Sequence, residues 1–104
     1  MVANQSTTDP ITVGSHLDVR NVAHVRTELN GALDRPEGDV IVDMRDVNMI
    51  DAAGLGMLTA AHLRAERAGR HVILRHCSDD IRRVFALTHL NRILHIDRTM
   101  EISA

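Results

Sequence analysis

The residues of this chain with chemical potential are seven histidines, one cysteine and a short segment of aspartate and glycines. The histidines show none of the spacings typical of a metal-binding motif. His71, His76 and Cys77 surround a predicted strand and could hold a metal ion, although solvated positions at a strand end explain them as well. A thiol nucleophile at Cys77 is a further alternative, but a neighbouring His76 does not by itself create the geometry that such catalysis needs. We therefore expect no catalytic residue, no metal site and no cofactor.

The aspartate and glycine segment, Asp51 to Gly56, lies where a predicted strand leads into a helix. Backbone N–H groups and the helix dipole at such a junction favour anions. The segment lacks the Lys-Ser/Thr pair of a phosphate-binding loop and the third glycine of a dinucleotide fingerprint. A helix cap, worth about 1 kcal/mol, also explains Asp51, and close packing of helix and strand explains the glycines. From residue types alone, its role stays open.

Length and composition predict one soluble domain. The chain has 104 residues, of which 44% are hydrophobic and 25% charged, the balance of an ordinary globular protein. We expect residues 1–9 to form a flexible N-terminal tail and residues 10–104 a single domain. One cysteine cannot build a disulfide framework. The start lacks the features of a signal peptide and no apolar run is long enough to span a membrane, so we expect a cytoplasmic protein without membrane insertion.

Charge and aromatic content exclude further classes of function. The formal net charge is −2, which disfavours a general electrostatic grip on nucleic acid, so we expect no direct nucleic-acid contact. Phe85 is the only aromatic residue, so the core must be aliphatic. A stacking platform for bases is therefore excluded.

The hydrophobic pattern alternates between strands and helices and predicts an α/β or α+β layer fold. Short strands are expected at 11–13, 40–42, 72–74 and 93–96, the first of them at a sheet edge, and residues 14–18 form a turn or extend that strand. A first helix begins near Asn21, with Asp18 or Asn21 as its cap, and its apolar positions are Val22, Val25, Leu29, Ala32 and Leu33. A second follows Asp51 and ends at Gly69, with His62 largely off an apolar face made of Leu55, Leu58, Ala61, Ala65 and Ala68. A third is capped by residues 78–80 and buries Ile81, Val84, Phe85 and Leu87.

Residues 40–58, VIVDMRDVNMIDAAGLGML, resemble the central signature of STAS domains, the fold of bacterial anti-sigma factor antagonists. In that family a strand ending in Asp leads through a short loop to Asp-Ser-Ser/Thr-Gly-Leu-Gly at a helix start. Residues 81–96 are similar to the family's third helix and last strand. Residues 16–18 look like the end of its Gly-Glu-Leu-Asp, with the Glu position changed. The resemblance covers about residues 11–97 and implies a four- or five-stranded mixed sheet with about three to four packed helices.

The resemblance also implies a function, namely reversible docking to an anti-sigma factor with a serine-kinase ATPase fold, which frees a sigma factor. The family's phosphorylated Ser or Thr falls at Ala53, and Ala52 precedes it. Alanine has no hydroxyl, so neither position accepts a phosphoryl group. The chain is then an antagonist that is always competent, a decoy or scaffold, or a protein with another regulatory input, such as Thr59 or Cys77.

The resemblance implies that the partner binds at the same junction. Asp51 would cap the helix, Ala53 would present a small flat surface, and Gly54 and Gly56 would admit a partner's backbone, although core packing explains Met57 equally well. The full predicted set is Asp18, Met49, Asp51, Ala52, Ala53, Gly54, Leu55, Gly56 and Met57. Two alternatives stay open: a cytosolic subunit that binds the ATPase of a lipid-transport ABC system, and a nucleotide or anion sensor. The sequence predicts neither a monomer nor an oligomer.

Overall fold

The computed structural model describes residues 10–36 and 38–97, and the tail predicted over residues 1–9 lies outside the described residues. Four strands form one sheet in the order β1-β3-β5-β6, and two more form a small second sheet. The first sheet comprises β1 (Ile11–Thr12), β3 (Val40–Asp43), β5 (Val72–Arg75) and β6 (His95–Ile96). The second comprises β2 (His16–Leu17) and β4 (Met49–Ile50).

Three helices connect these strands: α1 (Val22–Leu33), α2 (Ala52–Arg67) and α3 (Asp79–Leu87). Parallel strands need a crossover of a dozen or more residues, which a helix supplies. The predicted α/β class and helix count are confirmed. Every strand pairing among the described residues is parallel, so the antiparallel pair of a mixed sheet is not found there. The predicted edge position of the first strand is confirmed.

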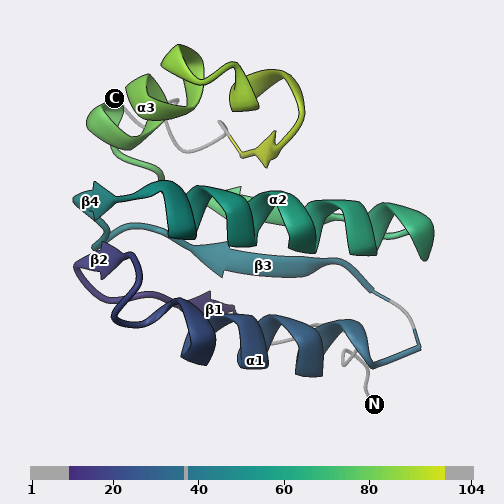
Figure 1. The fold of residues 1–104 in the computed structure, drawn as a ribbon. Coiled ribbons are helices and arrows are strands. Elements are labelled where there is room, and N and C mark those ends of the chain that lie inside the picture. The colour runs from purple at the N-terminus through teal and green to yellow at the C-terminus, as the bar shows by residue number, and fades with distance from the viewer. Residues whose placement is uncertain (1–9, 37, 98–104) are drawn as a thin grey trace.

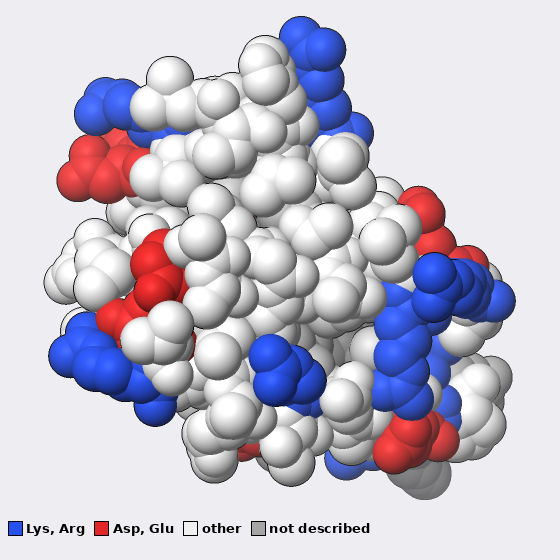
Figure 2. Space-filling model, in the orientation of Figure 1, with Lys and Arg blue, Asp and Glu red and all other residues white. Residues whose placement is uncertain are grey.

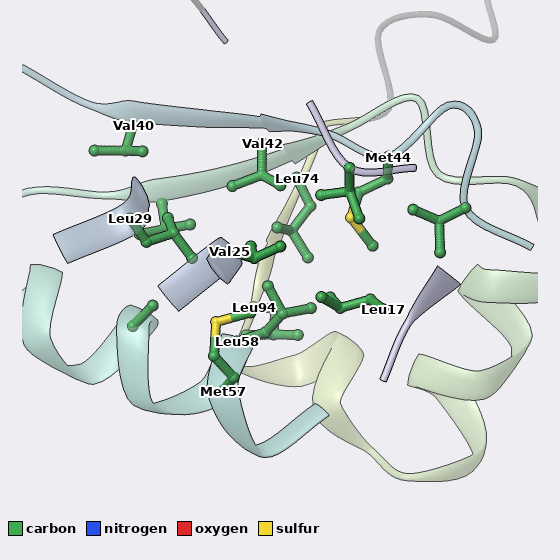
Figure 3. Packing of buried hydrophobic residues seen from close by; sticks show 14 of the residues in the cluster. Leu17, Val25, Leu29, Val40, Val42, Met44, Met57, Leu58, Leu74 and Leu94 are labelled. Carbon is green, nitrogen blue, oxygen red and sulfur yellow. The ribbon is translucent and has the colours of Figure 1, made fainter. Parts of the chain in front are cut away.

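Helices α1 and α2 lie side by side across one face of the four-stranded sheet, and α3 lies beyond α2 (Figure 1). Burial along the central strands follows from this layer. Val40 and Val42 of β3 are buried, and Ile41 between them is half-buried. The core is aliphatic apart from Phe85, which is fully buried, and Figure 3 shows part of it between β3, β5 and the helices.

Capping residues explain where the helices begin and end. Ser78 caps α3 by accepting a hydrogen bond from the Ile81 N–H at 3.2 Å, and Gly69 follows α2 with a φ of +71°, as predicted. Asn21 holds the N-cap position of α1, but its side chain makes no cap hydrogen bond. It accepts from the Asp18 N–H and donates to the His16 carbonyl instead.

The predicted buried face of α1 is confirmed at all five positions, whereas those of α2 and α3 are partly wrong. In α2, Leu55 is half-buried, and His62, expected off the apolar face, is 3% exposed. Ala68 is exposed because the helix ends one residue before it. The helix is turned so that Met57 and His62 face inward. In α3, Val84 is half-buried and Leu87 is 75% exposed, because the helix ends there.

The last strand is shorter than predicted. A 3₁₀ helix, η1 (Leu90–Arg92), follows α3 and delays β6 to His95. Ile93, expected to begin the strand, is 45% exposed as a result.

A buried arginine joins α1 to the start of β5. The Arg70 guanidinium donates to the carbonyls of Ala32, Leu33, Arg35 and Gly38 at 2.7–3.2 Å. Carbonyls at a helix C-terminus have no partner within the helix, and a cation there also interacts favourably with the helix dipole. Arg70 therefore caps α1 from a distant part of the chain, although residue 70 carried no such prediction.

None of the described helices combines the length and the apolar character that crossing a bilayer requires.

Candidate functional site

The junction of β2, β4 and α2 is held together by the Asp51 carboxylate. One oxygen accepts from the Gly54 N–H at 2.9 Å and so caps α2, as predicted. The other accepts from the Val19 N–H at 3.3 Å, in the loop between β2 and α1. The Asp51 N–H in turn donates to the Leu17 carbonyl. A single side chain thus fixes the helix start and a loop distant in sequence.

Gly54 lets α2 approach β2 closely. A Cβ at this position would lie 2.3 Å from the Leu17 carbonyl oxygen and 2.9 Å from a side-chain carbon of Ile50. Because the first contact is with backbone, any side chain at position 54 would push the helix away. A Cβ at Gly56, in contrast, would meet nothing within 4 Å. Gly54 serves the chain's own packing, and Gly56 opens to the surface.

Asp18 is 3% exposed and is held by its neighbour Arg20. The guanidinium donates to both carboxylate oxygens, the shortest contact being 2.8 Å, and the Arg20 N–H donates to one of them. This hydrogen bonding from the Arg20 side chain holds the pKa of Asp18 below its usual value, against the opposing effect of burial. The Arg20 side chain is 62% exposed. Asp18 is therefore covered by Arg20, whose side chain reaches the surface.

We define the junction surface as Val19, Arg20, Met49, Ala52, Ala53 and Gly56. Val19 is 71% exposed and Met49 43%, Ala52 and Gly56 are exposed, and Ala53 is half-buried. Figure 1 shows β2, β4 and the start of α2 at one end of the molecule. In Figure 2 the middle of the α1 and α2 face is mostly uncharged, with acidic and basic side chains mixed at its margins. The junction surface combines small and apolar residues with the Arg20 side chain, and the half-buried Asp51 lies beside it.

The remaining predicted contact residues lie beneath the junction surface. Met57 is 4% exposed and belongs to the core, the alternative that the sequence left open (Figure 3). Gly54 is buried, and Leu55 is half-buried and packs against the core. The Thr59 hydroxyl donates to the Leu55 carbonyl at 2.9 Å. Val19 and Arg20 were not predicted, and the only sequence signal for them was their place directly after residues 16–18.

The cysteine and histidine alternatives lie at opposite ends of β5, with His71 before the strand and His76 and Cys77 after it, and they do not form a site among the described residues. Cys77 is 5% exposed, and burial raises the pKa of its thiol to about 11, the opposite of what an activated nucleophile needs. The His71 imidazole pairs with Asp39 at 3.3 Å. Within residues 10–36 and 38–97, the close set of potential metal ligands is His62, Glu66 and His95 instead. This set was not predicted from the sequence, in which the four-residue spacing of His62 and Glu66 was the available signal.

Comparison with known proteins identifies the family. The family model for the STAS domain matches residues 3–102, nearly the whole chain. The chain belongs to the STAS domain family. The resemblance inferred from residues 40–58 and 81–96 is thus confirmed.

Individual relatives agree with this assignment. The anti-sigma-B factor antagonist of Staphylococcus aureus (strain NCTC 8325 / PS 47) is 25% identical over 92 residues, which cover 88% of this STAS domain and 85% of the relative. The structure of the anti-sigma factor antagonist SpoIIAA in its unphosphorylated form superposes with a TM-score of 0.64 at 20% identity, covering 88% and 81% of the two chains. A sulfate transporter family protein from Wolinella succinogenes gives a TM-score of 0.71 at 22% identity, covering 95% and 83%. The two structures have the same fold as this domain.

Proposed function

We propose that this STAS domain is an anti-sigma factor antagonist whose docking is not switched by phosphorylation at the α2 N-terminus. Its partner would be an anti-sigma factor with a serine-kinase ATPase fold, and docking would free a sigma factor. The observation that carries the proposal is Ala53 in the first turn of α2, on the junction surface, where the family's signature has Ser or Thr. The 25% identity to an anti-sigma-B factor antagonist supports the partner class.

The junction surface suits a protein partner. Ala52 and Gly56 project little or nothing beyond the backbone, so a partner can come close to the first turns of α2. Val19 and Met49 add exposed apolar side chains beside them, and methionine adapts its shape to different surfaces. Arg20 adds a charged group of the kind enriched at protein interfaces. Met57, Gly54 and Leu55 contribute by holding α2 in position rather than by direct contact.

The missing hydroxyl removes the usual switch. A phosphate would add about −1.5 to −2 charge at this surface and disrupt a close contact there. Thr59 is a poor substitute because its hydroxyl is half-buried and hydrogen-bonded to the Leu55 carbonyl. Cys77 is a poor redox input because it is buried and its pKa is raised. These features favour an antagonist that is always competent over one with another input at these residues.

Asp51 argues against a nucleotide or anion sensor at the same place. Its carboxylate already accepts the Gly54 N–H, one of the donors that an anion would use. A negative charge fixed at the helix start also repels a second anion. The transport-subunit alternative differs only in the partner, so its test is the identity of the bound protein.

Affinity capture from the cells that make the protein tests the proposal. The baits are the wild type, Ala52→Asp, Ala53→Asp and the control Ala68→Asp. Ala68 is exposed at the other end of α2, about 22 Å away at 1.5 Å per residue, and it lies near Arg64 and Arg67 of the last turn. The melting temperature of each variant establishes that it is folded.

The proposal predicts a serine-kinase-fold anti-sigma factor on the wild-type and control baits and its loss from Ala52→Asp and Ala53→Asp. An ABC ATPase in its place would support the transport-subunit alternative. A rise in melting temperature with millimolar GTP, and no captured protein, would support a sensor.

A further inference from the structure

We propose that His62, Glu66 and His95 form a binding site for a divalent transition-metal ion of the zinc class. The nearest donor atoms of the three side chains all lie within 4.8 Å of one another. The His62 Nε2 and a Glu66 carboxylate oxygen are 3.5 Å apart. Two ligands on a tetrahedral ion, each about 2.0–2.1 Å from it, are separated by roughly 3.4 Å. The helix pair is therefore already at coordinating distance.

Orphaned ring nitrogens are the second observation that points to a ligand. His62 Nδ1 and His95 Nε2 are buried and have no hydrogen-bond partner. His62 itself is 3% exposed, and the two rings lie 5.4 Å apart between centroids. A buried polar atom without a partner is costly. A metal ion bound through His62 Nε2, the Glu66 carboxylate and His95 Nε2 gives the buried His95 nitrogen a partner, whereas His62 Nδ1 lies on the other side of its ring from the ion.

The elements that carry the ligands suit coordination. Residues 62 and 66 are four apart on α2, so their side chains share one face of the helix, and His95 comes from β6 at the sheet edge. Two imidazoles and a carboxylate match zinc, copper, nickel or iron, whereas Mg²⁺ and Ca²⁺ prefer oxygen ligands. Three protein ligands leave one tetrahedral position for water or another group.

A pocket borders one of the three ligands, His95. It has a volume of about 680 Å³, and His95 and His71 are among its lining residues. The His71 ring contacts the His95 ring edge-on at 4.6 Å, which restricts the orientation of the ligand. The site lies 9 to 13 positions along α2 from Ala53, at least about 13 Å at 1.5 Å per residue. It is thus separate from the junction surface and does not depend on the proposed docking function.

The chain contains its own control. His24 and Glu28 form an i, i+4 pair on α1 with 3.8 Å between Nε2 and a carboxylate oxygen, but both are exposed, and the described residues place no third ligand with them. The test compares the untagged wild-type chain with Glu66→Gln, His95→Gln and His24→Gln. Glu66 has a 54% exposed side chain, so Glu66→Gln keeps the fold even if His95→Gln does not.

Zn²⁺ binding is measured by competition with a chromophoric chelator, and Co²⁺ binding by its visible ligand-field bands. We expect one Zn²⁺ per wild-type chain, tetrahedral Co²⁺ bands without a thiolate charge-transfer band, and an unchanged affinity for His24→Gln. Loss of an outer-shell partner weakens a metal site about 10- to 100-fold, so loss of a direct ligand in Glu66→Gln or His95→Gln should weaken it by at least about tenfold. Zn²⁺ should also raise the wild-type melting temperature through linkage.

Three results would overturn the metal site. The first is no Zn²⁺ binding by the folded wild type at about 100 µM. The second is an affinity that Glu66→Gln leaves unchanged. The third is a loss of affinity in His24→Gln as large as in Glu66→Gln, because the ion would then bind any exposed helix pair.

Discussion

At the scale of single residues, the two glycines at the start of α2 have different physical roles. Gly54 lies against the Leu17 carbonyl, and Gly56 faces open space. The sequence motif Gly-Leu-Gly treats them alike, and both were expected to admit a partner. The geometry assigns only Gly56 to the surface, so the two positions respond differently to the same substitution.

Gly54→Ala should destabilise the fold by about 1–3 kcal/mol or more, because the new Cβ overlaps backbone. Gly56→Ala should stabilise it by about 0.5–1 kcal/mol, since alanine favours a helix over glycine. Urea denaturation of both variants measures the difference. Equal effects would mean that the tight contact at Gly54 does not exist in solution.

The buried Cys77 thiol should make the stability of the fold depend on pH. Its pKa is raised to about 11 in the folded protein from an ordinary value of 9.0, so its favourable contribution is present in full below about pH 9. That contribution is lost as the pH rises from about 9 to about 11, because the unfolded chain releases the proton first. The chain has no Tyr and no Lys, so no other side chain titrates in this range.

The melting temperature should therefore fall between pH 9 and pH 11 in the wild type and fall less in Cys77→Ala. At pH 8 the folded thiol should react with iodoacetamide at least about 100-fold more slowly than the unfolded one, since two pKa units change the thiolate fraction that much. Equal alkylation rates would contradict the buried, raised-pKa thiol.

At the scale of elements, the sequence predicts what neighbours in the chain decide. The five apolar positions of α1, the Asp51 and Ser78 caps and the Gly69 end depend on local spacing, and all are confirmed. The rotation of α2 depends on what packs against it, so the burial of His62 was missed. Arg70 caps the C-terminus of α1, and Asp51 binds the Val19 N–H in the loop before α1. Each interaction joins segments more than thirty residues apart, which periodicity does not predict.

Replacing Arg70 tests how much the C-terminal cap of α1 contributes to the free energy of unfolding. Arg70→Met keeps much of the side-chain volume but removes the guanidinium from four carbonyls at and after the end of α1, of which the Ala32 carbonyl keeps the Arg35 N–H as a donor. Hydrogen bonds to a charged group contribute about 1.5–3 kcal/mol, so the free energy of unfolding should fall by about 3 kcal/mol. Arg67→Met, at an exposed position of α2, is the control and should change it by less than about 0.5 kcal/mol. Equal unfolding free energies for the two variants would show that Arg70 is no cap.

At the scale of the whole molecule, the family signature predicted more than composition did. Composition and spacing predicted a small α/β domain but no function. Residues 40–58 indicated the STAS family. The same signature placed the candidate surface at the junction of β2, β4 and α2, and that location stays a prediction. The signature does not indicate which of the predicted contact residues are exposed: Met57 is buried by core packing and Asp18 by its ion pair with Arg20.

A hydroxyl restored at position 53 tests the proposed absence of a phosphorylation switch. Ala53→Ser returns a hydroxyl to the position before Gly54, so a cognate anti-sigma factor with kinase activity should phosphorylate it in the presence of Mg-ATP, while the wild type stays unmodified there. Intact-mass spectrometry detects the added phosphate. An active kinase that leaves Ala53→Ser unmodified would contradict the equivalence of position 53 with the family's phosphorylated residue.

The most direct test of docking at the α2 N-terminus is the dissociation constant of the purified partner, measured by titration calorimetry for the wild type, Ala53→Asp and Ala68→Asp. A charge pressed into a close interface costs about 2–4 kcal/mol, or roughly 30- to 700-fold in affinity. We predict that loss for Ala53→Asp, with no change for Ala68→Asp and both variants folded. Equal affinities for the wild type and Ala53→Asp would contradict the account.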